Sequence, residues 1–366
     1  MNAKKRPRIV IAGLGDTGLL VAIHLAKHAD VVGISSKPGL VSGQELGLRL
    51  TRPHEWRRDY WIPFERYRRL DGVRTVHGTI TGLDTDARVV HVEAPDGTKL
   101  DEAYDVLVIA TGVTNGFWRT PELKSDGDVE SELHDAHARI ANADSVIVIG
   151  GGAAAVSSAW NIARTWPTKR VDLYFPGDRA LPHHHRRVWD LLRDRLASRG
   201  VGIHSGHRAD RPATTDEITN ESVTWSTGQT PASADAVLWA IGRVRPNTDW
   251  VPTDLLDADG FVRVDEYLRV APSVYAIGDV AASDPLRSSA RARADQLLAG
   301  NIRADLGHGR ARRFKPLRRR WGSVLGAQDN RLEVFGPTGR TFTIPAWGVL
   351  QPWFVRRAIY KGIRPR

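Results

Sequence analysis

Three glycines near the N-terminus have the type and spacing that bind the pyrophosphate of a dinucleotide. Gly13, Gly15 and Gly18 form a GxGxxG pattern. The first glycine of such a pattern permits a tight turn, the second lets the backbone approach the phosphates, and the third lets a helix pack against a strand. A lone pattern of this kind is as often a structural glycine loop as a nucleotide site, so the surrounding elements decide between the two interpretations.

The elements expected around these glycines favour a nucleotide site. Residues 8–13, mostly apolar, predict a buried strand, residues 19–28 a helix, and residues 30–35 a second strand. Together they make a βαβ unit. The N-terminus of its helix offers backbone N–H groups and a partial positive charge to the phosphates.

A second fingerprint follows about 137 residues later. Gly150, Gly152 and Ala155 form the GxGxxA variant, directly after the apolar run 145–149 and before an apolar helix and a further strand at 170–175. Because each βαβ unit serves one pyrophosphate, two fingerprints predict two nucleotides bound by two domains.

The chain contains no cysteine among its 366 residues. Mechanisms that need a thiolate, a disulfide, an iron–sulfur cluster or a cysteine-ligated metal are therefore excluded. The consecutive histidines at 183–185 do not predict a metal site, because neighbouring side chains point in different directions. A GxSxG nucleophile motif is also absent from the sequence. We predict no metal and no protein-based catalytic residue.

The positive charge of the chain is concentrated in its last segment. The net charge is +10, and residues 310–366 carry 14 Lys or Arg against 2 Asp or Glu. Its final part contains both basic residues and the apolar residues Trp347, Leu350, Trp353, Phe354, Ile359 and Tyr360. This mixture is typical of a helix lying on an anionic membrane. It is equally typical of a helix that packs on its own domain or forms a homodimer, and Pro352 interrupts the helical pattern. A specific nucleic-acid partner is not predicted, because no nucleic-acid module accompanies the charge.

The expected location is cytoplasmic, with possible peripheral binding to the inner face of the membrane. The basic and apolar N-terminus resembles a secretory signal, but its glycines break the apolar run and no cleavage site follows. No apolar run reaches the roughly 18 residues of a membrane-spanning helix.

Further segments resemble the pyridine nucleotide-disulfide oxidoreductase superfamily, whose flavoproteins contain two dinucleotide-binding domains. The strand ending at Thr111 and Gly112 resembles the turn that closes the family's FAD site, and Gly242 resembles the exit from the nicotinamide domain. Gly278 and Asp279 resemble the position where a carboxylate holds the FAD ribityl chain; a surface turn is the alternative. The resemblance implies an α/β fold with two Rossmann-like domains: an FAD part at 1–112 and 244–309, an NAD(P)H part at 113–243 and a basic extension at 310–366.

Without the redox cysteine pair, the chain is most similar to type II NADH dehydrogenases and to quinone reductases related to apoptosis-inducing factor. Arg49 aligns with a flavin-site arginine, although a solvated helix charge is the alternative. The stretch that carries an Ala-Gln motif near the quinone site of type II dehydrogenases has Arg291 and Arg293 here. This departure weakens the quinone assignment.

In each of the two βαβ units, the end of the second strand also departs from the dinucleotide-binding pattern. A carboxylate usually binds the ribose hydroxyls at that position. In the first unit the second strand ends with Ser35, Ser36 and Lys37, and in the second unit the corresponding strand ends at residues 174–176 with Tyr, Phe and Pro. Arg179 lies nearby and favours NADPH slightly, unless it is a solvated loop charge.

The resemblance implies an FAD enzyme that takes hydride from NADH or NADPH and passes electrons to a small acceptor, which we expect to be a quinone. A reductase for a ferredoxin-like protein is an alternative, since an acidic partner would suit the basic tail. A slow flavoprotein that senses nucleotides is another. A flavin monooxygenase is less consistent with the sequence, which has no FxGxxxHxxxW-type segment between the fingerprints.

Overall fold

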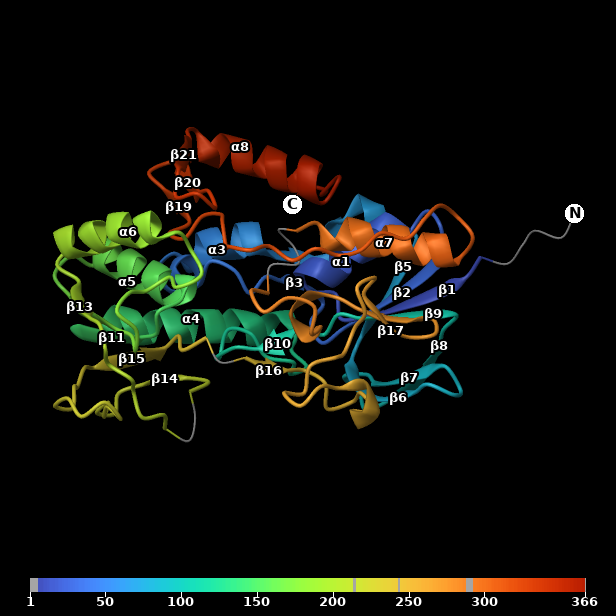
Figure 1. The fold of residues 1–366 in the computed structure, drawn as a ribbon, viewed down its shortest axis with the longest axis horizontal. Coiled ribbons are helices and arrows are strands. Elements are labelled where there is room, and N and C mark those ends of the chain that lie inside the picture. Colours follow the sequence, from blue (N-terminus) through green and yellow to red (C-terminus); the bar gives the residue numbers. More distant parts are fainter. Residues whose placement is uncertain (1–5, 213–214, 243, 288–291, 366) are drawn as a thin grey trace, which may run out of the picture.

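The computed structural model describes residues 6–212, 215–242, 244–287 and 292–365. It contains two parallel-rich sheets side by side, with the C-terminal segment lying along both (Figure 1). The α/β class with two Rossmann-like sheets is therefore confirmed. Arg243 and Arg291 lie outside the described residues.

The first sheet draws its strands from both ends of the chain. Its order is β17 (Arg269–Ala271), β18 (Val274–Ala276), β9 (Val106–Ile109), β1 (Arg8–Ala12), β2 (Asp30–Ser35) and β5 (Val73–His77). All neighbours are parallel except β17 and β18. Ile9 and Ile11 face a core shared with α1 and α7, whereas Val10 and Ala12 face a core shared with a smaller sheet. Burial on both faces explains why β1 is continuously apolar.

The second sheet lies entirely between residues 145 and 239. Its order is β13 (Gly202–His204), β12 (Arg170–Tyr174), β11 (Ser145–Ile149), β15 (Ala236–Trp239) and β14 (Ile218–Thr219). The edge strand β14 is antiparallel and the other pairs are parallel. Val146 and Val148 pack under the helices, while Ile147 and Ile149 pack against Trp225 on the opposite face.

Four small sheets complete the strands of the described chain. They are β6 (Thr79–Asp84), β7 (Val89–Glu93) and β8 (Lys99–Ala103); β3 (Gly39–Val41) and β4 (Trp61–Pro63); β10 (Val113–Thr114) and β16 (Arg245–Pro246); and β19 (Ala327–Gln328), β20 (Arg331–Phe335) and β21 (Thr341–Ile344). Strands β10 and β16 pair where the chain enters and leaves the second sheet, so both crossings lie side by side.

The α-helices are α1 (Asp16–Leu25), α2 (Leu46–Thr51), α3 (Pro53–Tyr60), α4 (Asp126–Asn142), α5 (Ala153–Thr165), α6 (Arg186–Ser198), α7 (Ala294–Asp305) and α8 (Trp347–Trp353). Short 3-10 turns are η1 (Phe64–Arg66), η2 (Arg68–Leu70), η3 (Thr253–Leu255) and η4 (Gly278–Val280), and η5 (Phe354–Ile359) is a π-helix. The predicted helix at 19–28 in fact covers 16–25, because Asp16 and Thr17 form its first turn, where an acidic residue is favoured by the helix dipole.

The C-terminal segment packs against both halves of the molecule. Val324, Leu325 and Phe335 join the core under the second sheet, and Tyr360 and Ile363 join the core under the first. The π-helix η5 begins two residues after Pro352, the helix-internal proline of α8, whose missing N–H disturbs the regular helical bonding. No helix in the described ranges is long and apolar enough to cross a membrane.

Candidate cofactor site

The first glycine fingerprint forms a turn in which side chains have no room. Gly13 has φ of +106°, and a Cβ there would lie 2.5 Å from the carbonyl oxygen of Ala110. A Cβ on Gly18 would lie 1.9 Å from the carbonyl oxygen of Gly13, so α1 touches the turn. Space is open within 4 Å of the position a Cβ on Gly15 would take. Gly15 is therefore where a ligand can approach the backbone.

The second fingerprint repeats this turn with one difference. Gly150 has φ of +140°, and a Cβ there would lie 2.0 Å from the carbonyl oxygen of Ala240, while Gly152 faces open space. At the third position, Ala155 is fully buried, so α5 leaves room for a methyl group.

The helices that follow both fingerprints begin without a side-chain cap. Among the described residues, no side chain accepts a hydrogen bond at the N-terminus of α1 or α5. Helix α4, by contrast, begins with a capping box made by Ser125 and Asp128. Since the N-cap residues of α1 and α5 are glycines, no side chain at that position competes with a phosphate for the first N–H groups.

One cavity of about 1720 Å³ connects the two fingerprints. Its lining includes these predicted site residues: Gly13, Gly15, Arg49, Thr111, Gly112, Gly150, Gly152, Arg179, Gly242, Gly278 and Asp279. Gly18 and Ala155 do not line it, because they serve the packing of the two helices. Gly112, Gly242 and Gly278 have φ of +69°, +68° and +84°, a conformation that favours glycine.

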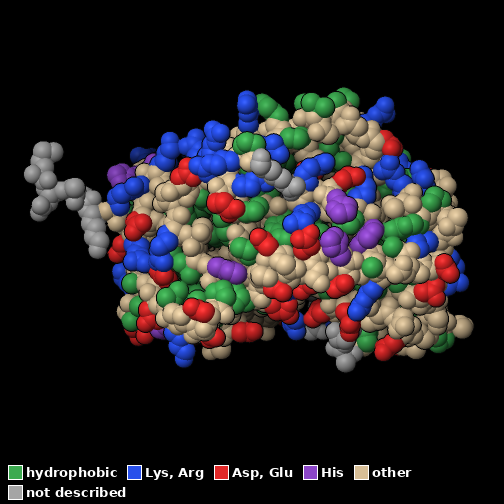
Figure 2. Space-filling view, turned by 180° about the vertical axis from the view of Figure 1, so that it is seen from behind, with side chains coloured by type: hydrophobic (Ala, Val, Ile, Leu, Met, Phe, Trp, Pro, Cys, Tyr) green, Lys and Arg blue, Asp and Glu red, His purple; other side chains and the backbone are tan. Residues whose placement is uncertain are grey.

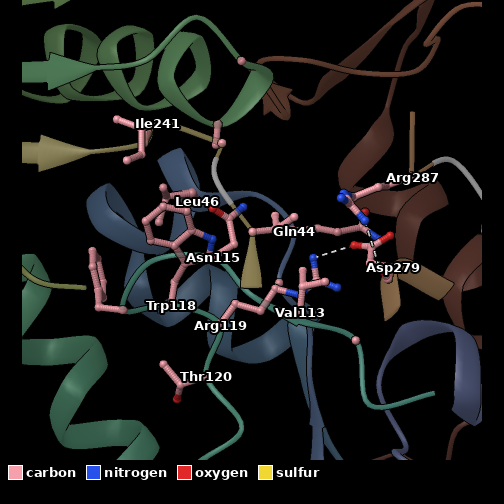
Figure 3. Close-up of a pocket in the computed structure, with 18 of the residues that line it drawn as sticks. Gln44, Leu46, Val113, Asn115, Trp118, Arg119, Thr120, Ile241, Asp279 and Arg287 are labelled. Atoms are coloured by element: carbon pink, nitrogen blue, oxygen red, sulfur yellow. Dashed lines mark hydrogen bonds and ion pairs between the residues drawn. The ribbon is translucent and has the colours of Figure 1, made fainter. Parts of the chain in front are cut away.

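Asp279 projects into this cavity between two arginines (Figure 3). Arg119 Nη1 lies 2.8 Å from Asp279 Oδ2, and Arg287 Nη1 donates to the Asp279 carbonyl oxygen at 2.9 Å. The Arg287 guanidinium also stacks over Phe261, 4.2 Å from the ring centroid. Sequence reasoning identified Asp279 but missed both arginines, since neither belongs to a recognised motif.

Arg49 is buried in the cavity wall and is not a solvated helix charge. It donates to the Trp118 carbonyl oxygen at 3.0 Å and its guanidinium lies 4.8 Å from the Trp56 ring centroid. Burial lowers the pKa of Arg49 to about 10. Its Nε is buried and has no hydrogen-bond partner among the described residues, which leaves a donor for a ligand.

The end of β2 carries a lysine where a carboxylate is usual. Lys37 Nζ donates to Ser36 Oγ at 3.1 Å and to the carbonyl oxygens of Thr120 and Glu122, at 2.5 Å and 3.0 Å. Burial, reinforced by the nearby charge of Lys124, lowers the pKa of Lys37 to about 8. Ser35 and Ser36 line the cavity beside it and are the hydroxyls available to a ribose.

The end of β12 is different, because the residue that follows it in the cavity wall is aromatic and also packs inward. Phe175 is buried against Trp189, with ring centroids 5.4 Å apart. Arg179 donates to the carbonyl oxygens of Pro182 and His184, at 3.0 Å and 3.5 Å, and so ties down its own loop. Further basic residues of the cavity wall, which sequence reasoning missed, are His207, Arg208 and Arg211.

Asp16 occupies a variable position of the GxGxxG pattern, so the pattern itself does not identify this carboxylate. Its Oδ1 accepts from Ser42 Oγ at 3.0 Å. Burial raises the pKa of Asp16, and the positive charge of Arg119 opposes that rise. The 42–45 loop is thereby fixed to the start of α1.

The residues present fit FAD and a second dinucleotide. The fit rests on two glycine cradles that a Cβ would fill, two uncapped helix N-termini, and the buried donor of Arg49. A pyrophosphate at Gly15 and a polyol chain at Asp279 would lie on one wall of the cavity, and a second pyrophosphate at Gly152 on the other. The C-terminal segment supplies a third wall through Ser323 and Val324.

Comparison with known proteins agrees with this arrangement. The family described as pyridine nucleotide-disulphide oxidoreductase matches residues 7–296. Oxidoreductase ptaL of Pestalotiopsis fici is 32% identical over 221 residues, covering 58% of this chain and 58% of that protein. This chain thus spans little more than half the length of that curated relative. Apoptosis-inducing factor homolog A of Dictyostelium discoideum is 22% identical over 333 residues, covering 84% and 78%. The ferredoxin reductase for the CYP199A2 system of Rhodopseudomonas palustris has a similar fold, with a TM-score of 0.67, 19% identity and coverage of 98% and 95%.

The fold and the paired cradles define a two-dinucleotide flavoprotein. The chain belongs to the pyridine nucleotide-disulphide oxidoreductase family, as its sequence resemblance predicted. FAD and a pyridine nucleotide are the cofactors of this family, so the predicted cofactors are confirmed at that level. The chain lacks cysteine, so it cannot perform the disulfide chemistry in the family's name.

Proposed function

We propose that the protein is an FAD-dependent NAD(P)H dehydrogenase that delivers electrons to a quinone. The observation that carries this proposal is the single cavity shared by Gly15, Gly152 and Asp279, with a third wall from the C-terminal segment. Bound FAD would accept hydride from the nicotinamide nucleotide and return the electrons to an acceptor. The chain itself supplies binding, orientation and exclusion of water.

The residues of each half have distinct binding tasks in this proposal. The N–H groups of α1 would hold the FAD pyrophosphate, Ser35 or Ser36 the ribose, and Asp279 the ribityl hydroxyls. The N–H groups of α5 would hold the NAD(P)H pyrophosphate. Both NADH and NADPH are expected to be accepted, because neither Tyr174 nor Phe175 at the end of β12 is a carboxylate. Both signs of charge line the cavity beyond that point, through Asp178 and Arg208.

The surface of the C-terminal segment indicates the side from which we expect the electron acceptor to approach. Among the described residues, the large apolar side chains that are exposed all belong to residues 342–354: Phe342, Val349, Leu350, Trp353 and Phe354. Figure 2 shows hydrophobic side chains at the top edge of the molecule, where α8 lies, with lysine and arginine side chains on both sides. Apolar anchors next to arginines suit an anionic membrane surface, from which a quinone would reach the cavity.

An anaerobic titration tests the electron path. We expect the flavin absorbance of the purified holoprotein to bleach with NADH or NADPH and to return with a short-chain quinone. Rapid return with a ferredoxin and slow return with quinone would replace the proposed acceptor by a protein, as the similarity to a ferredoxin reductase allows. Reduction by both nucleotides over hours would favour a nucleotide sensor. A protein that cannot take up FAD would refute the proposal.

Vesicle sedimentation tests the membrane surface. We expect the protein to bind vesicles of phosphatidylcholine with phosphatidylglycerol, and the double variant Trp353→Ser/Phe354→Ser to lose at least tenfold in affinity. The matched control is Arg186→Gln/Arg193→Gln, which removes two exposed arginines of α6 and leaves the apolar side chains of α8 and η5 unchanged. Light scattering is run in parallel. A dimer that the apolar variant converts to a monomer, without vesicle binding by either, would identify the surface as a subunit interface.

A further inference from the structure

Arg119 crosses the cofactor crevice of the first half. Its stem passes Gly43, where a Cβ would lie 2.9 Å from Arg119 Cδ, and its Nη2 lies 3.6 Å from the position a Cβ on Gly112 would take. Its Nη1 reaches Asp279 Oδ2 at 2.8 Å (Figure 3). The guanidinium therefore lies at the carboxyl ends of β9 and β18, where ligands of such sheets bind.

The backbone of Arg119 is held firmly in this place. Asn115 N–H donates to the Arg119 carbonyl oxygen at 3.0 Å, and Arg119 N–H donates to the Gly116 carbonyl oxygen at 3.3 Å. The preceding residue, Trp118, is buried, and its carbonyl oxygen accepts from Arg49. The turn is fixed from both sides, and the ion pair with Asp279 directs the guanidinium into the crevice.

The charges around this guanidinium alternate. The guanidinium pairs with Asp279 and acts electrostatically on Asp16, and Arg287 donates to the Asp279 carbonyl oxygen. Removing Arg119 would take one positive charge away from the two carboxylates and leave Arg287, with Arg320 near it, as the arginines of this part of the cavity wall. Such a change acts strongly on any group that gains negative charge there, because the site is partly shielded from water.

We propose that Arg119 is a positioning residue of the flavin site, which fixes the Asp279 carboxylate for the ribityl chain and raises the reduction potential of the bound flavin. The proposal rests on the proposed FAD function. Its physical basis is that a cation near Gly112 and Asp279 stabilises the negative charge of reduced flavin more than the neutral oxidised form.

Redox titration of the holoprotein against reference dyes tests the potential, and flavin fluorescence tests the dissociation constant of FAD. In Arg119→Gln, we expect the ratio of reduced to oxidised flavin at fixed potential to fall at least tenfold, about 30 mV for a two-electron couple. The FAD dissociation constant should rise at least tenfold. Arg119→Lys keeps the charge and should retain most of the potential while losing part of the FAD affinity.

The matched control is Arg195→Gln, which breaks the ion pair of Arg195 with Glu333 outside the cavity. The side chains of that pair are 35% and 21% exposed, against 34% and 19% for Arg119 and Asp279. We expect the control to leave both readouts unchanged. If Arg119→Gln also leaves the potential and FAD affinity at wild-type values, the residue merely joins two segments and the inference is wrong.

A further variant keeps the inference testable if Arg119→Gln fails to fold. Asp279→Asn removes a negative charge from the same pair, so it should raise the potential, the opposite direction from Arg119→Gln. A lowered potential in Asp279→Asn would overturn the inference. A wild-type protein that holds no FAD would instead defeat the proposed function, so the two failures are distinguishable.

Discussion

The two halves of the molecule form the same glycine turn, but they differ in how closely the following helix packs against it. In both, the first glycine lies on a carbonyl at the end of a neighbouring strand, Ala110 in one half and Ala240 in the other. In both, the first glycine N–H donates to the end of the second strand, Ile34 or Tyr174, at 3.0 Å and 2.8 Å. The halves differ at the helix, since α1 touches its turn at Gly18 whereas α5 accommodates Ala155.

This difference shows that the third fingerprint position reports helix packing and not ligand contact. Neither Gly18 nor Ala155 lines the cavity. A glycine is required there only where the helix lies directly on the turn, as α1 does. The sequence difference between GxGxxG and GxGxxA is thus a difference in the distance between a helix and a strand.

We expect the largest effect from exchanging glycine and alanine at the third fingerprint position. Gly18→Ala would place a methyl group 1.9 Å from a carbonyl oxygen, so we expect loss of FAD and of most folded protein. Ala155→Gly removes a buried methyl and weakens helix α5, at about 1–2 kcal/mol. FAD content and urea unfolding check both variants. If the two variants had equal free energies of unfolding, the inferred difference in helix packing between the halves would be wrong.

A second exchange separates the two halves functionally. Gly150→Ala forces a Cβ to within 2.0 Å of the Ala240 carbonyl oxygen at a φ of +140°. We expect the rate of flavin reduction by NAD(P)H to fall at least 100-fold, while bound FAD stays near one per chain. Stopped-flow absorbance measures the rate. If flavin content falls in parallel with the rate, the halves do not bind their nucleotides independently.

The end of β2 is followed by a buried lysine that the end of β12 lacks, and the pH dependence of folding stability tests this difference. Lys37 has its pKa lowered to about 8, so the folded chain loses that proton well before the unfolded chain does, near pH 10.5. Between those values the unfolded state binds more protons, and folding stability rises with pH. Relative to Lys37→Gln, the wild type should gain on the order of 2 kcal/mol between pH 8 and pH 10. Urea unfolding at both pH values measures it, and a constant difference would contradict a buried lysine.

The smallest expected effect concerns the choice of nucleotide. Arg179 binds carbonyl oxygens of its own loop, whereas Arg208 is exposed on the cavity wall. Arg208→Ala should raise the KM for NADPH about threefold to tenfold and leave the KM for NADH unchanged. Arg179→Ala should change both nucleotides alike through the loop. A selective NADPH effect in Arg179→Ala alone would restore the prediction made from sequence.

The sequence predicts the parts of the site that lie in single segments. The two glycine turns, Thr111–Gly112 and Gly278–Asp279 each follow one apolar strand, so local pattern and chain order suffice to find them. Arg119 and Arg287 could not be found this way. They meet at Asp279 from segments 160 and 8 residues distant, and only the packed fold brings them together. The role of Arg179 was uncertain for the same reason.

The sheet order has a consequence for how the chain folds during synthesis. The second sheet is complete once residue 239 has been made. The first sheet must wait for β17 and β18, and its core for Tyr360, which packs edge-on against Tyr67 with ring centroids 5.2 Å apart. The half that is begun first on the ribosome is therefore finished last, and its apolar strands need shielding until the final residues emerge.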